Sequence, residues 1–263
     1  MDQLPTVYWI TGASSGIGEA LAKQLGRSGN ALIISGRDVS ALENLKSNLP
    51  QGVPVQILPF ELSQLEQFPE IVGKALSFFG HVDVLVNNAG VSQRSPAMET
   101  SADVERKLME INYFAPVALT KALLPHFIAR KKGHIVVVSS IAGKFGFALR
   151  STYAAAKHAL HGYFEALRLE LKDVPVYVTL ICPGRVLTKI SFNAVKGDGS
   201  AHNQLDDGQR NGITAEYCAK VIDKAIKNKK YEVLTGKMEL LPVYLRRYCP
   251  PVFYWLIKKV KAT

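Results

Sequence analysis

The sequence has few cysteines, and those it has are arranged neither as a disulfide framework nor as a metal site. Cys182, Cys218 and Cys249 are far apart in the 263-residue chain, and no two form a C-x-x-C pair. This spacing argues against a disulfide-stabilised scaffold and against a zinc site. We therefore expect a protein of a reducing compartment that binds no metal.

Long hydrophobic runs are also missing. No apolar run approaches the ~20 residues of a transmembrane helix. The first expected strand begins near Thr6, which leaves no room for a signal peptide. Hydrophobic residues make up 48% of the chain and charged residues 21%, as in an ordinary globular protein. We expect a single domain over residues 1–263, located in the cytoplasm.

Acidic residues are outnumbered by basic ones, and the formal net charge is +10. Such a charge favours anionic partners, among them nucleotide phosphates, nucleic acid and an anionic membrane surface. A well-solvated basic surface accounts for the same charge. Because nucleic-acid binding has no other support in the sequence, we expect no nucleic-acid partner.

Short apolar runs alternate with helical patterns along most of the chain. The runs are continuous rather than alternating, which is typical of parallel strands buried on both faces. They cover residues 6–11, 31–35, 55–60, 82–87, 135–139, 176–182 and 232–234. Helical patterns cover residues 16–28, 39–49, 62–79, 102–131, 152–172 and 215–227. This alternation predicts an α/β fold of the Rossmann type, a doubly wound parallel sheet of about seven strands with helices on both faces.

Two segments near the end of the chain depart from this pattern. Residues 189–212 are polar, and a loop this long in a compact domain is usually functional, so we expect a mobile lid that orders on binding. The tail, residues 240–263, combines aromatic and basic side chains. It could lie on an anionic membrane surface or pack against the lid or another subunit. Its aromatic residues are Tyr244, Tyr248, Phe253, Tyr254 and Trp255, and its basic residues are Arg246, Arg247, Lys258, Lys259 and Lys261.

A glycine-rich turn, TGASSGIG at residues 11–18, joins the first expected strand to the first expected helix. Glycines permit a tight turn, and the helix N-terminus offers free N–H groups to a pyrophosphate. A plain strand-to-helix turn is the alternative. The expected dinucleotide contacts here are Gly12, Ser14, Ser15, Gly16, Ile17 and Gly18.

The same turn also matches G-x-S-x-G, the nucleophile elbow of serine hydrolases. Only eleven residues precede Gly12, which leaves no upstream loop to form an oxyanion hole, and no downstream Asp and His pair stands out. The sequence therefore favours a dinucleotide site.

The end of the second expected strand indicates which nicotinamide cofactor is bound. An acidic residue there would bind the ribose 2′-hydroxyl of NAD, but this chain has Gly36 followed by Arg37. A guanidinium can bind a 2′-phosphate through charge-assisted bonds. We therefore expect NADP(H) in preference to NAD(H), with Arg37 as a contact. Asp38 is better explained as the cap of the following helix.

With these motifs the chain resembles the short-chain dehydrogenase/reductase family in its single-domain form, from about residue 6 to about residue 235. Within the family it is similar to members such as dehydrogenase/reductase family member 7 and 11β-hydroxysteroid dehydrogenase. The motifs occur in the family's order and are specific as a set. They are TGASSGIG at 11–18, NNAG at 87–90, Asn112, SSIAG at 139–143, YAAAK at 153–157 and PGRVLT at 183–188.

The catalytic chemistry centres on Tyr153 and Lys157, which are four residues apart and share one helix face. A tyrosine pKa of ~10 is too high for an efficient base, and a nearby ammonium lowers it. Tyr153 could then give a proton to a carbonyl oxygen or take one from an alcohol. The resemblance places Lys157 on the nicotinamide ribose and assigns substrate-oxygen binding to Ser140 rather than Ser139.

The resemblance also implies further site residues. Asn112 would support a water-linked proton path to Lys157, although a polar contact between helices is an alternative. At the adenine the family usually has Asp before an apolar residue, and this chain departs from that pattern with Glu61 before Leu62. The other implied cofactor contacts are Leu62, Asn88, Ala89, Gly90, Val186 and Thr188.

Several side chains have less specific interpretations. Arg150 could face an acidic substrate, but solvent is the interpretation we favour. His158 and His161 lie one turn apart without a third ligand at suitable spacing, so a surface or interface pair is expected rather than a metal site. The expected substrate-site rim, Val91, Ser92, Phe145, Phe147 and Leu149, is mostly apolar.

These features together predict an oxidoreductase that transfers hydride between NADP(H) and a hydrophobic ketone, aldehyde or secondary alcohol. The resemblance implies a homodimer or homotetramer built on the helices of residues 102–131 and 152–172. A catalytically idle nucleotide-binding protein on the same fold is the alternative. The presence of Asn112, Ser140, Tyr153 and Lys157 together argues against it.

Overall fold

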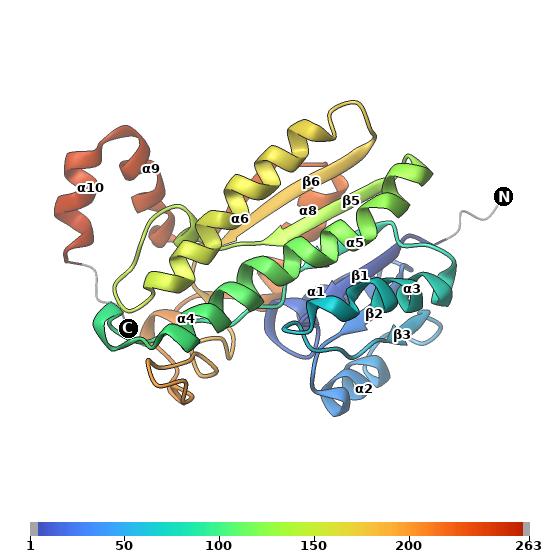
Figure 1. The fold of residues 1–263 in the computed structure, drawn as a ribbon, viewed down its shortest axis with the longest axis horizontal. Coiled ribbons are helices and arrows are strands. Elements are labelled where there is room, and N and C mark those ends of the chain that lie inside the picture. Colours follow the sequence, from blue (N-terminus) through green and yellow to red (C-terminus); the bar gives the residue numbers. More distant parts are fainter. Residues whose placement is uncertain (1–4, 260–263) are drawn as a thin grey trace.

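The computed structural model describes residues 5–259, and a parallel sheet of seven strands lies at its centre (Figure 1). Neighbouring strands follow the order β3-β2-β1-β4-β5-β6-β9, and every pairing is parallel. The predicted fold class is therefore confirmed. The strands are β1 (Val7–Thr11), β2 (Ala31–Ser35), β3 (Val55–Ile57), β4 (Val84–Asn87), β5 (Gly133–Val138), β6 (Val176–Pro183) and β9 (Glu232–Thr235).

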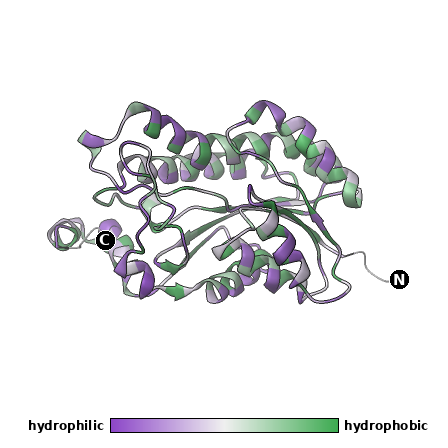
Figure 2. Ribbon diagram, turned by 90° about the horizontal axis from the view of Figure 1, so that it is seen from below, coloured by the Kyte–Doolittle hydropathy of each residue, from purple (hydrophilic) through white to green (hydrophobic). Residues whose placement is uncertain are grey.

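Helices cover both faces of this sheet, which forms the middle layer in Figure 2. On one face, α1 (Gly16–Gly26), α2 (Val39–Ser47) and α8 (Ala215–Lys227) bury Ile10 and Ile34. On the other, α3 (Phe68–Phe79), α5 (Ala115–Arg130) and α6 (Ser151–Glu170) bury Trp9 and Ile33. Adjacent strand residues point to opposite faces, so continuous apolar runs supply both layers of the core.

Some expected elements end earlier or are interrupted. The expected strand 55–60 ends at Ile57, and the expected helix 62–79 begins only at Phe68, where Pro69 occupies its first turn. The expected helix 102–131 is divided into α4 (Ala102–Met109), a π-helical turn (Glu110–Phe114) and α5. Such π turns occur frequently at functional sites.

The polar segment expected to be a loop contains regular structure. Its two ends are held by β7 (Val186–Leu187) and β8 (Ile213–Thr214), which pair in parallel, and a short helix, α7 (Asp207–Arg210), precedes β8. Ser191 and Asp206 are buried within it. The segment is therefore polar without being exposed along its whole length. Its movement as a lid stays a prediction.

The C-terminal tail forms two short helices, α9 (Leu241–Tyr248) and α10 (Pro250–Ile257), beside the main body (Figure 1). Phe253 of α10 is buried against Phe145, with ring centroids 5.4 Å apart. Lys261, one of the basic residues of the tail, lies outside the described residues. Within residues 5–259, no helix combines the length and the apolar character needed to cross a membrane.

Candidate active site

A cavity of about 1350 Å³ opens at the carboxyl ends of the central strands, where ligands bind in open α/β sheets. It is lined by nearly every residue that the sequence assigned to the cofactor or to catalysis. These are Gly12, Ser14, Ser15, Gly16, Ile17, Arg37, Glu61, Leu62, Asn88, Ala89, Gly90, Asn112, Ser140, Tyr153, Lys157, Val186 and Thr188. Gly18 does not line the cavity; it packs against the backbone carbonyl of Gly12.

The glycine turn has the backbone conformation that a dinucleotide site needs. Gly12 and Gly16 have φ angles of +66° and +59°, in the left-handed region that favours glycine. A Cβ atom on Gly18 would lie 2.3 Å from the carbonyl oxygen of Gly12. Ser15 precedes α1 without capping it through its side chain, so the first-turn N–H groups remain available for a phosphate.

Thr11 and Asn88 connect the glycine turn to the end of β4. The Asn88 side-chain amide donates to the backbone carbonyls of Thr11 at 2.9 Å and Gly12 at 3.2 Å. The Thr11 hydroxyl oxygen accepts from the backbone N–H groups of Asn88 and Ala89. Asn88 therefore holds the backbone of the glycine turn through these two hydrogen bonds. Sequence reasoning did not identify the role of Thr11, because its partners are about 77 residues away.

The residues after β2 lie at the edge of the cavity, next to the glycine turn. A Cβ atom on Gly36 would lie 3.2 Å from the Ser14 hydroxyl, so a larger side chain there would crowd the glycine turn. Arg37 is exposed and lines the cavity next to it. The Asp38 carboxylate accepts from the Ala41 N–H at 2.9 Å, which confirms it as the helix cap.

Ser140, Tyr153 and Lys157 come together at the other end of the cavity. Ser140 follows β5, and its hydroxyl donates to the Pro183 carbonyl at 3.4 Å and accepts from the Ala142 N–H at 3.1 Å, beside Tyr153 on α6. The Lys157 ammonium donates to the Val138 carbonyl at 2.9 Å and lies 5.7 Å from the Tyr153 ring centroid. Ser139 has a different environment, because its hydroxyl donates to the Lys157 backbone carbonyl and contacts His161.

The protonation of this group differs from the sequence-based expectation. Burial raises the pKa of Tyr153, while the neighbouring Ser140 hydroxyl and the charges of Arg150 and Arg94 oppose that increase. Burial also lowers the pKa of Lys157 to about 8. The pKa of Tyr153 is thus raised on balance, Arg150 and Arg94 oppose that increase, and a lowering of this pKa by Lys157 stays a prediction.

Asn112 lies in the π turn between α4 and α5, and its side chain is fully engaged. Its Oδ1 accepts from the Val91 N–H at 3.1 Å, and its Nδ2 donates to the carbonyls of Val91 and Leu108, each at 2.9 Å. A Cβ atom on Gly90 would lie 2.7 Å from Asn112 Oδ1 and 3.6 Å from Lys157 Nζ. Asn112 thus holds the chain after β4 beside Lys157, and its place in a proton path stays a prediction.

Gln93 holds the first turn of α6, although nothing in the sequence indicated it. Its side chain is completely buried, and its Oε1 accepts from the backbone N–H groups of Thr152 at 3.0 Å and Tyr153 at 3.2 Å. Arg150, which precedes α6, provides no side-chain cap, so Gln93 satisfies N–H groups that the helix leaves free. A glutamine 59 residues upstream of the helix carries no local capping signal.

Two arginines and one aspartate form a cluster beside Tyr153. Arg94 donates through Nε and Nη2 to one carboxylate oxygen of Asp206, and Arg150 donates to the same oxygen at 3.0 Å. The exposed fractions of the three side chains are 2%, 16% and 3%. The interpretation of Arg150 as a solvent-facing residue is therefore wrong, because Asp206 of the polar segment folds back over it.

The predicted surface pair of histidines does not form. His158 bonds the Ala154 carbonyl, whereas His161 is buried against Ser139 and Cys182. The potential ligand atoms of His161, Cys182 and Glu232 lie within 4.8 Å of one another, so residues distant in sequence supply the missing third partner. However, the Lys144 ammonium contacts both His161 and Glu232, and burial raises the pKa of the Cys182 thiol to about 12. An internal ammonium and a protonated thiol do not suit a metal site.

The remaining rim residues are mostly placed as expected. Val91, Ser92, Phe145 and Phe147 line the cavity, whereas Leu149 does not. The Glu61 carboxylate accepts from the adjacent Leu62 N–H at 3.0 Å, so its acidic side chain is turned toward its own backbone. Val91, Phe145 and Phe147 make this part of the cavity wall apolar.

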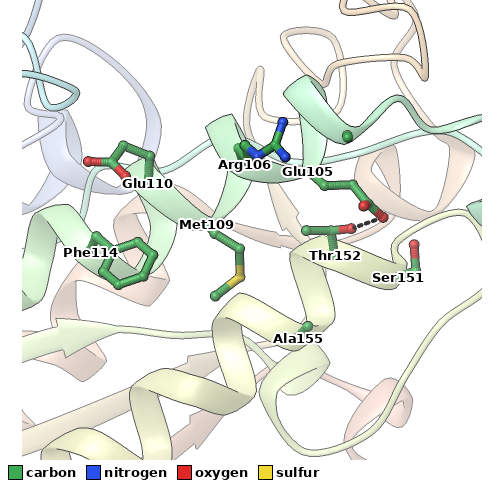
Figure 3. Close-up of a pocket in the computed structure, with 9 residues that line it drawn as sticks. Glu105, Arg106, Met109, Glu110, Phe114, Ser151, Thr152 and Ala155 are labelled. Carbon is green, nitrogen blue, oxygen red and sulfur yellow. Dashed lines mark hydrogen bonds between the residues drawn. The ribbon is translucent and has the colours of Figure 1, made fainter.

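A second hollow of about 730 Å³ lies outside this site, between α4, the π turn and the start of α6 (Figure 3). Its lining includes the apolar side chains of Met109 and Phe114, and the Thr152 hydroxyl donates to the Glu105 carboxylate across it at 3.1 Å. It contains none of the predicted catalytic residues.

The fold and this site define a dinucleotide-binding oxidoreductase, and comparisons with known proteins identify its family. The family model described as short chain dehydrogenase matches residues 6–198. Dehydrogenase/reductase SDR family member 7B of Mus musculus is 43% identical over 254 residues, which cover 94% of this chain and 79% of that protein. The chain therefore belongs to the short-chain dehydrogenase/reductase family, whose members are oxidoreductases of CH–OH and C=O groups.

Two solved structures share the fold of this chain. A short-chain dehydrogenase/reductase from Burkholderia phymatum in complex with NAD has a TM-score of 0.82 and 25% identity, covering 100% of this chain and 98% of that one. An alcohol dehydrogenase from Thermococcus sibiricus complexed with 5-hydroxy-NADP has a TM-score of 0.76 and 27% identity, covering 89% and 97%. Structural neighbours thus bind either nicotinamide dinucleotide, which supports a cofactor of this class here.

Proposed function

We propose that the protein is an NADP(H)-dependent oxidoreductase that acts on a hydrophobic ketone or aldehyde, or on the corresponding secondary alcohol. The observation that carries this proposal is the single cavity that joins Arg37 and the glycine turn to Ser140, Tyr153 and Lys157. The bound cofactor would supply or accept the hydride.

The residues of the chain fit an NADP(H) molecule in this cavity. The uncapped start of α1 at Gly16 suits the pyrophosphate, and Gly36 with Arg37 suits a 2′-phosphate. The cradle tolerates no larger side chain at Gly12, where a Cβ atom would lie 2.8 Å from the Ala89 backbone. Val186 and Thr188 would border the nicotinamide end.

Tyr153 acts as the proton donor in reduction and the acceptor in oxidation. Burial raises the pKa of its phenol, so the protonated form that a carbonyl oxygen requires dominates at neutral pH. The Ser140 hydroxyl holds the substrate oxygen next to it. Lys157, fixed by Val138, presents its remaining N–H groups to the cavity and binds the nicotinamide ribose.

The test is an oxidation assay with NADPH and NADH across carbonyl substrates of graded hydrophobicity. Tyr153→Phe should abolish turnover while leaving NADPH binding intact. Arg37→Ala should weaken NADPH more than NADH, because only NADPH carries the 2′-phosphate. Full activity of Tyr153→Phe would overturn the proton-transfer role, and an unchanged cofactor preference in Arg37→Ala would overturn the NADP(H) assignment.

The protein is further proposed to work as a homodimer or homotetramer. The hollow of Figure 3 lies on α4 and α6, and the Phe114 side chain on its border is 45% exposed, which suits a symmetric apolar contact. Sedimentation of the wild type and Phe114→Asp tests this proposal. A wild type that sediments as a monomer at micromolar concentration would contradict it.

Cytoplasmic location with peripheral membrane contact through the tail is also proposed. Tyr248, Tyr254 and Trp255 are exposed on α9 and α10 beside Arg247 and Lys258, a combination that suits an anionic interface. Co-sedimentation with phosphatidylserine vesicles should be lost in Trp255→Ser. Equal recovery of wild type with neutral and anionic vesicles would argue against the electrostatic contribution.

A further inference from the structure

The cluster of Arg94, Arg150 and Asp206 leaves one positive charge without a partner at the wall of the catalytic cavity. Two guanidinium groups share a single carboxylate oxygen, and all three residues line the cavity. His202, 3.6 Å from the other Asp206 oxygen, adds no negative charge. A buried charge without compensation is unfavourable, so the cluster is suited to receive an anion.

The two arginines differ in the donors that they leave free. Arg94 directs Nε and Nη2 to Asp206, and its Nη1 donates to the Ser92 hydroxyl at 2.8 Å and the Gln93 carbonyl at 2.6 Å. Arg150 makes one side-chain hydrogen bond to the described residues, through Nη2, and keeps 16% of its side chain exposed. A guanidinium carries five N–H donors, so Arg150 is the member that can bind a ligand.

Local structure holds Arg150 at this wall. The preceding residue, Leu149, has a φ of +64°, and its carbonyl accepts from the Ser95 N–H at 3.1 Å. A non-glycine residue in the left-handed region is strained, and such strain concentrates at functional sites. The guanidinium also lies 5.8 Å from the Phe147 ring centroid, beside the apolar part of the cavity.

The cofactor phosphates do not account for this charge. Arg37 and the glycine turn follow β2 and β1, whereas Ser140 follows β5. β2 and β5 are three strand spacings apart, about 14 Å. Arg150 is three residues from Tyr153 on the same helical start, so its charge belongs to the substrate end of the cavity. Burial lowers the pKa of Arg150 to about 10, which still leaves it charged at neutral pH.

We infer that Arg150 is a specificity residue that binds an anionic oxygen group, a carboxylate or a phosphate ester, on the substrate. The apolar body of that substrate lies against Phe145 and Phe147, and its carbonyl faces Tyr153. The inference rests on the proposed function and narrows it from hydrophobic carbonyl compounds to amphiphilic ones with an anionic group near the carbonyl.

The kinetic test compares aliphatic ketones of equal length as the carboxylic acid, the phosphate monoester and the uncharged methyl ester, with NADPH. The wild type should turn over an anionic form with a higher kcat/KM than the ester, and the better of the two identifies the natural group. Arg150→Gln should lower kcat/KM for that form ~10- to 100-fold, as expected for a lost charge-assisted bond, and change the ester less than ~2-fold. Arg150→Lys should fall between, because lysine keeps the charge but not the planar fork.

The matched control is Arg27→Gln, which removes the same charge from an exposed residue after α1 and should keep the anion preference. Thermal melting checks whether each variant is folded. If Arg150→Gln is unfolded, the substrate preference of the wild type and the kinetics of Arg150→Lys test the inference instead. A wild type that favours the ester, or an Arg150 variant that loses all substrates equally, overturns the inference.

A binding measurement separates this inference from the proposed function. Decanoate, decyl phosphate and decanol are titrated into NADP⁺-loaded protein by calorimetry. Anion binding that is weakened ~10-fold or more in Arg150→Gln supports the inference, even if no ketone is reduced. If no ketone is reduced, the proposed function is contradicted while the anion site stands. Anions that bind no tighter than decanol overturn the inference whatever the activity.

Discussion

Asp206 and Arg94 form a buried ion pair across 112 residues of sequence, with 2.9 Å between Asp206 Oδ2 and Arg94 Nε. The pair fastens the polar segment between β7 and β8 to the residues that follow β4. Arg150 joins the same carboxylate oxygen. One carboxylate therefore anchors the segment and sets the charge beside Tyr153.

Asp206→Asn should strongly destabilise the protein, because two buried guanidinium groups lose their common anion. Breaking a buried pair by removing one partner costs about 3–5 kcal/mol. Urea unfolding followed by circular dichroism measures this loss. The control is Asp207→Asn, an exposed carboxylate one residue further on, which should change the free energy of unfolding by less than ~0.5 kcal/mol. Equal effects of the two substitutions would show that the ion pair contributes nothing specific.

Gln93→Ala should reduce turnover without changing cofactor affinity. It leaves the N–H groups of Thr152 and Tyr153 without their acceptor, and small displacements of a reacting group cost up to ~100-fold in rate. We expect kcat to fall ~10- to 100-fold while the KM for NADPH is unchanged. Gln93→Glu keeps an acceptor oxygen and should recover much of the rate. A variant Gln93→Ala with wild-type kcat would mean that α6 holds Tyr153 unaided.

Gly18→Ala should abolish cofactor binding, because its Cβ atom would lie 2.3 Å from the Gly12 carbonyl and displace the glycine turn. NADPH fluorescence titration measures the effect. Gly73→Ala is the matched control: it lies in α3 with no atom within 4 Å of the added Cβ, and should stabilise the protein by ~0.5–1 kcal/mol. Tight NADPH binding by Gly18→Ala would show that the turn can rearrange.

Carbonyl reduction should decline as the pH rises through about 8, the pKa to which burial lowers Lys157. Below this pH the ammonium is present, and above it the lysine is neutral and loses its charge toward the ribose and Tyr153. The pH profile of kcat/KM with NADPH checks this. Lys157→Arg keeps its charge in this range and should lose the decline even if its overall rate is lower. If Lys157→Arg shows the same decline near this pH, the decline belongs to another titrating group.

His134 should make the fold sensitive to mild acid. Burial lowers its pKa from 6.5 to about 4, so the unfolded state binds more protons between these values. Its contribution to stability is complete above pH 6.5 and is lost as the pH falls toward 4. Between about pH 7.5 and about pH 5 we expect a loss of about 2 kcal/mol, absent in His134→Gln, when urea unfolding is measured at both values. Parallel pH dependences in the two proteins would rule His134 out.

The sequence alone was sufficient for the fold class and for most of the residues that line the cavity. Continuous apolar runs identified the strands because parallel strands are buried on both faces. TGASSGIG, NNAG and YAAAK predicted the cofactor and catalytic residues because backbone approach and helical spacing are local requirements. All the predicted cofactor and catalytic residues but Gly18 border one cavity.

Only the tertiary structure decided which distant residues surround Tyr153 and with what charge. Gln93, Arg94 and Asp206 carry no local signal, since the contacts that connect them to Arg150, Thr152 or one another join residues 56 to 112 apart. The sequence around Arg150 favours a surface position, and only the folded chain shows that Asp206 lies against its guanidinium. Protonation follows the same rule, because burial raises the Tyr153 pKa and lowers the Lys157 pKa. Motifs determine local backbone geometry, whereas burial and charge compensation are properties of the folded chain.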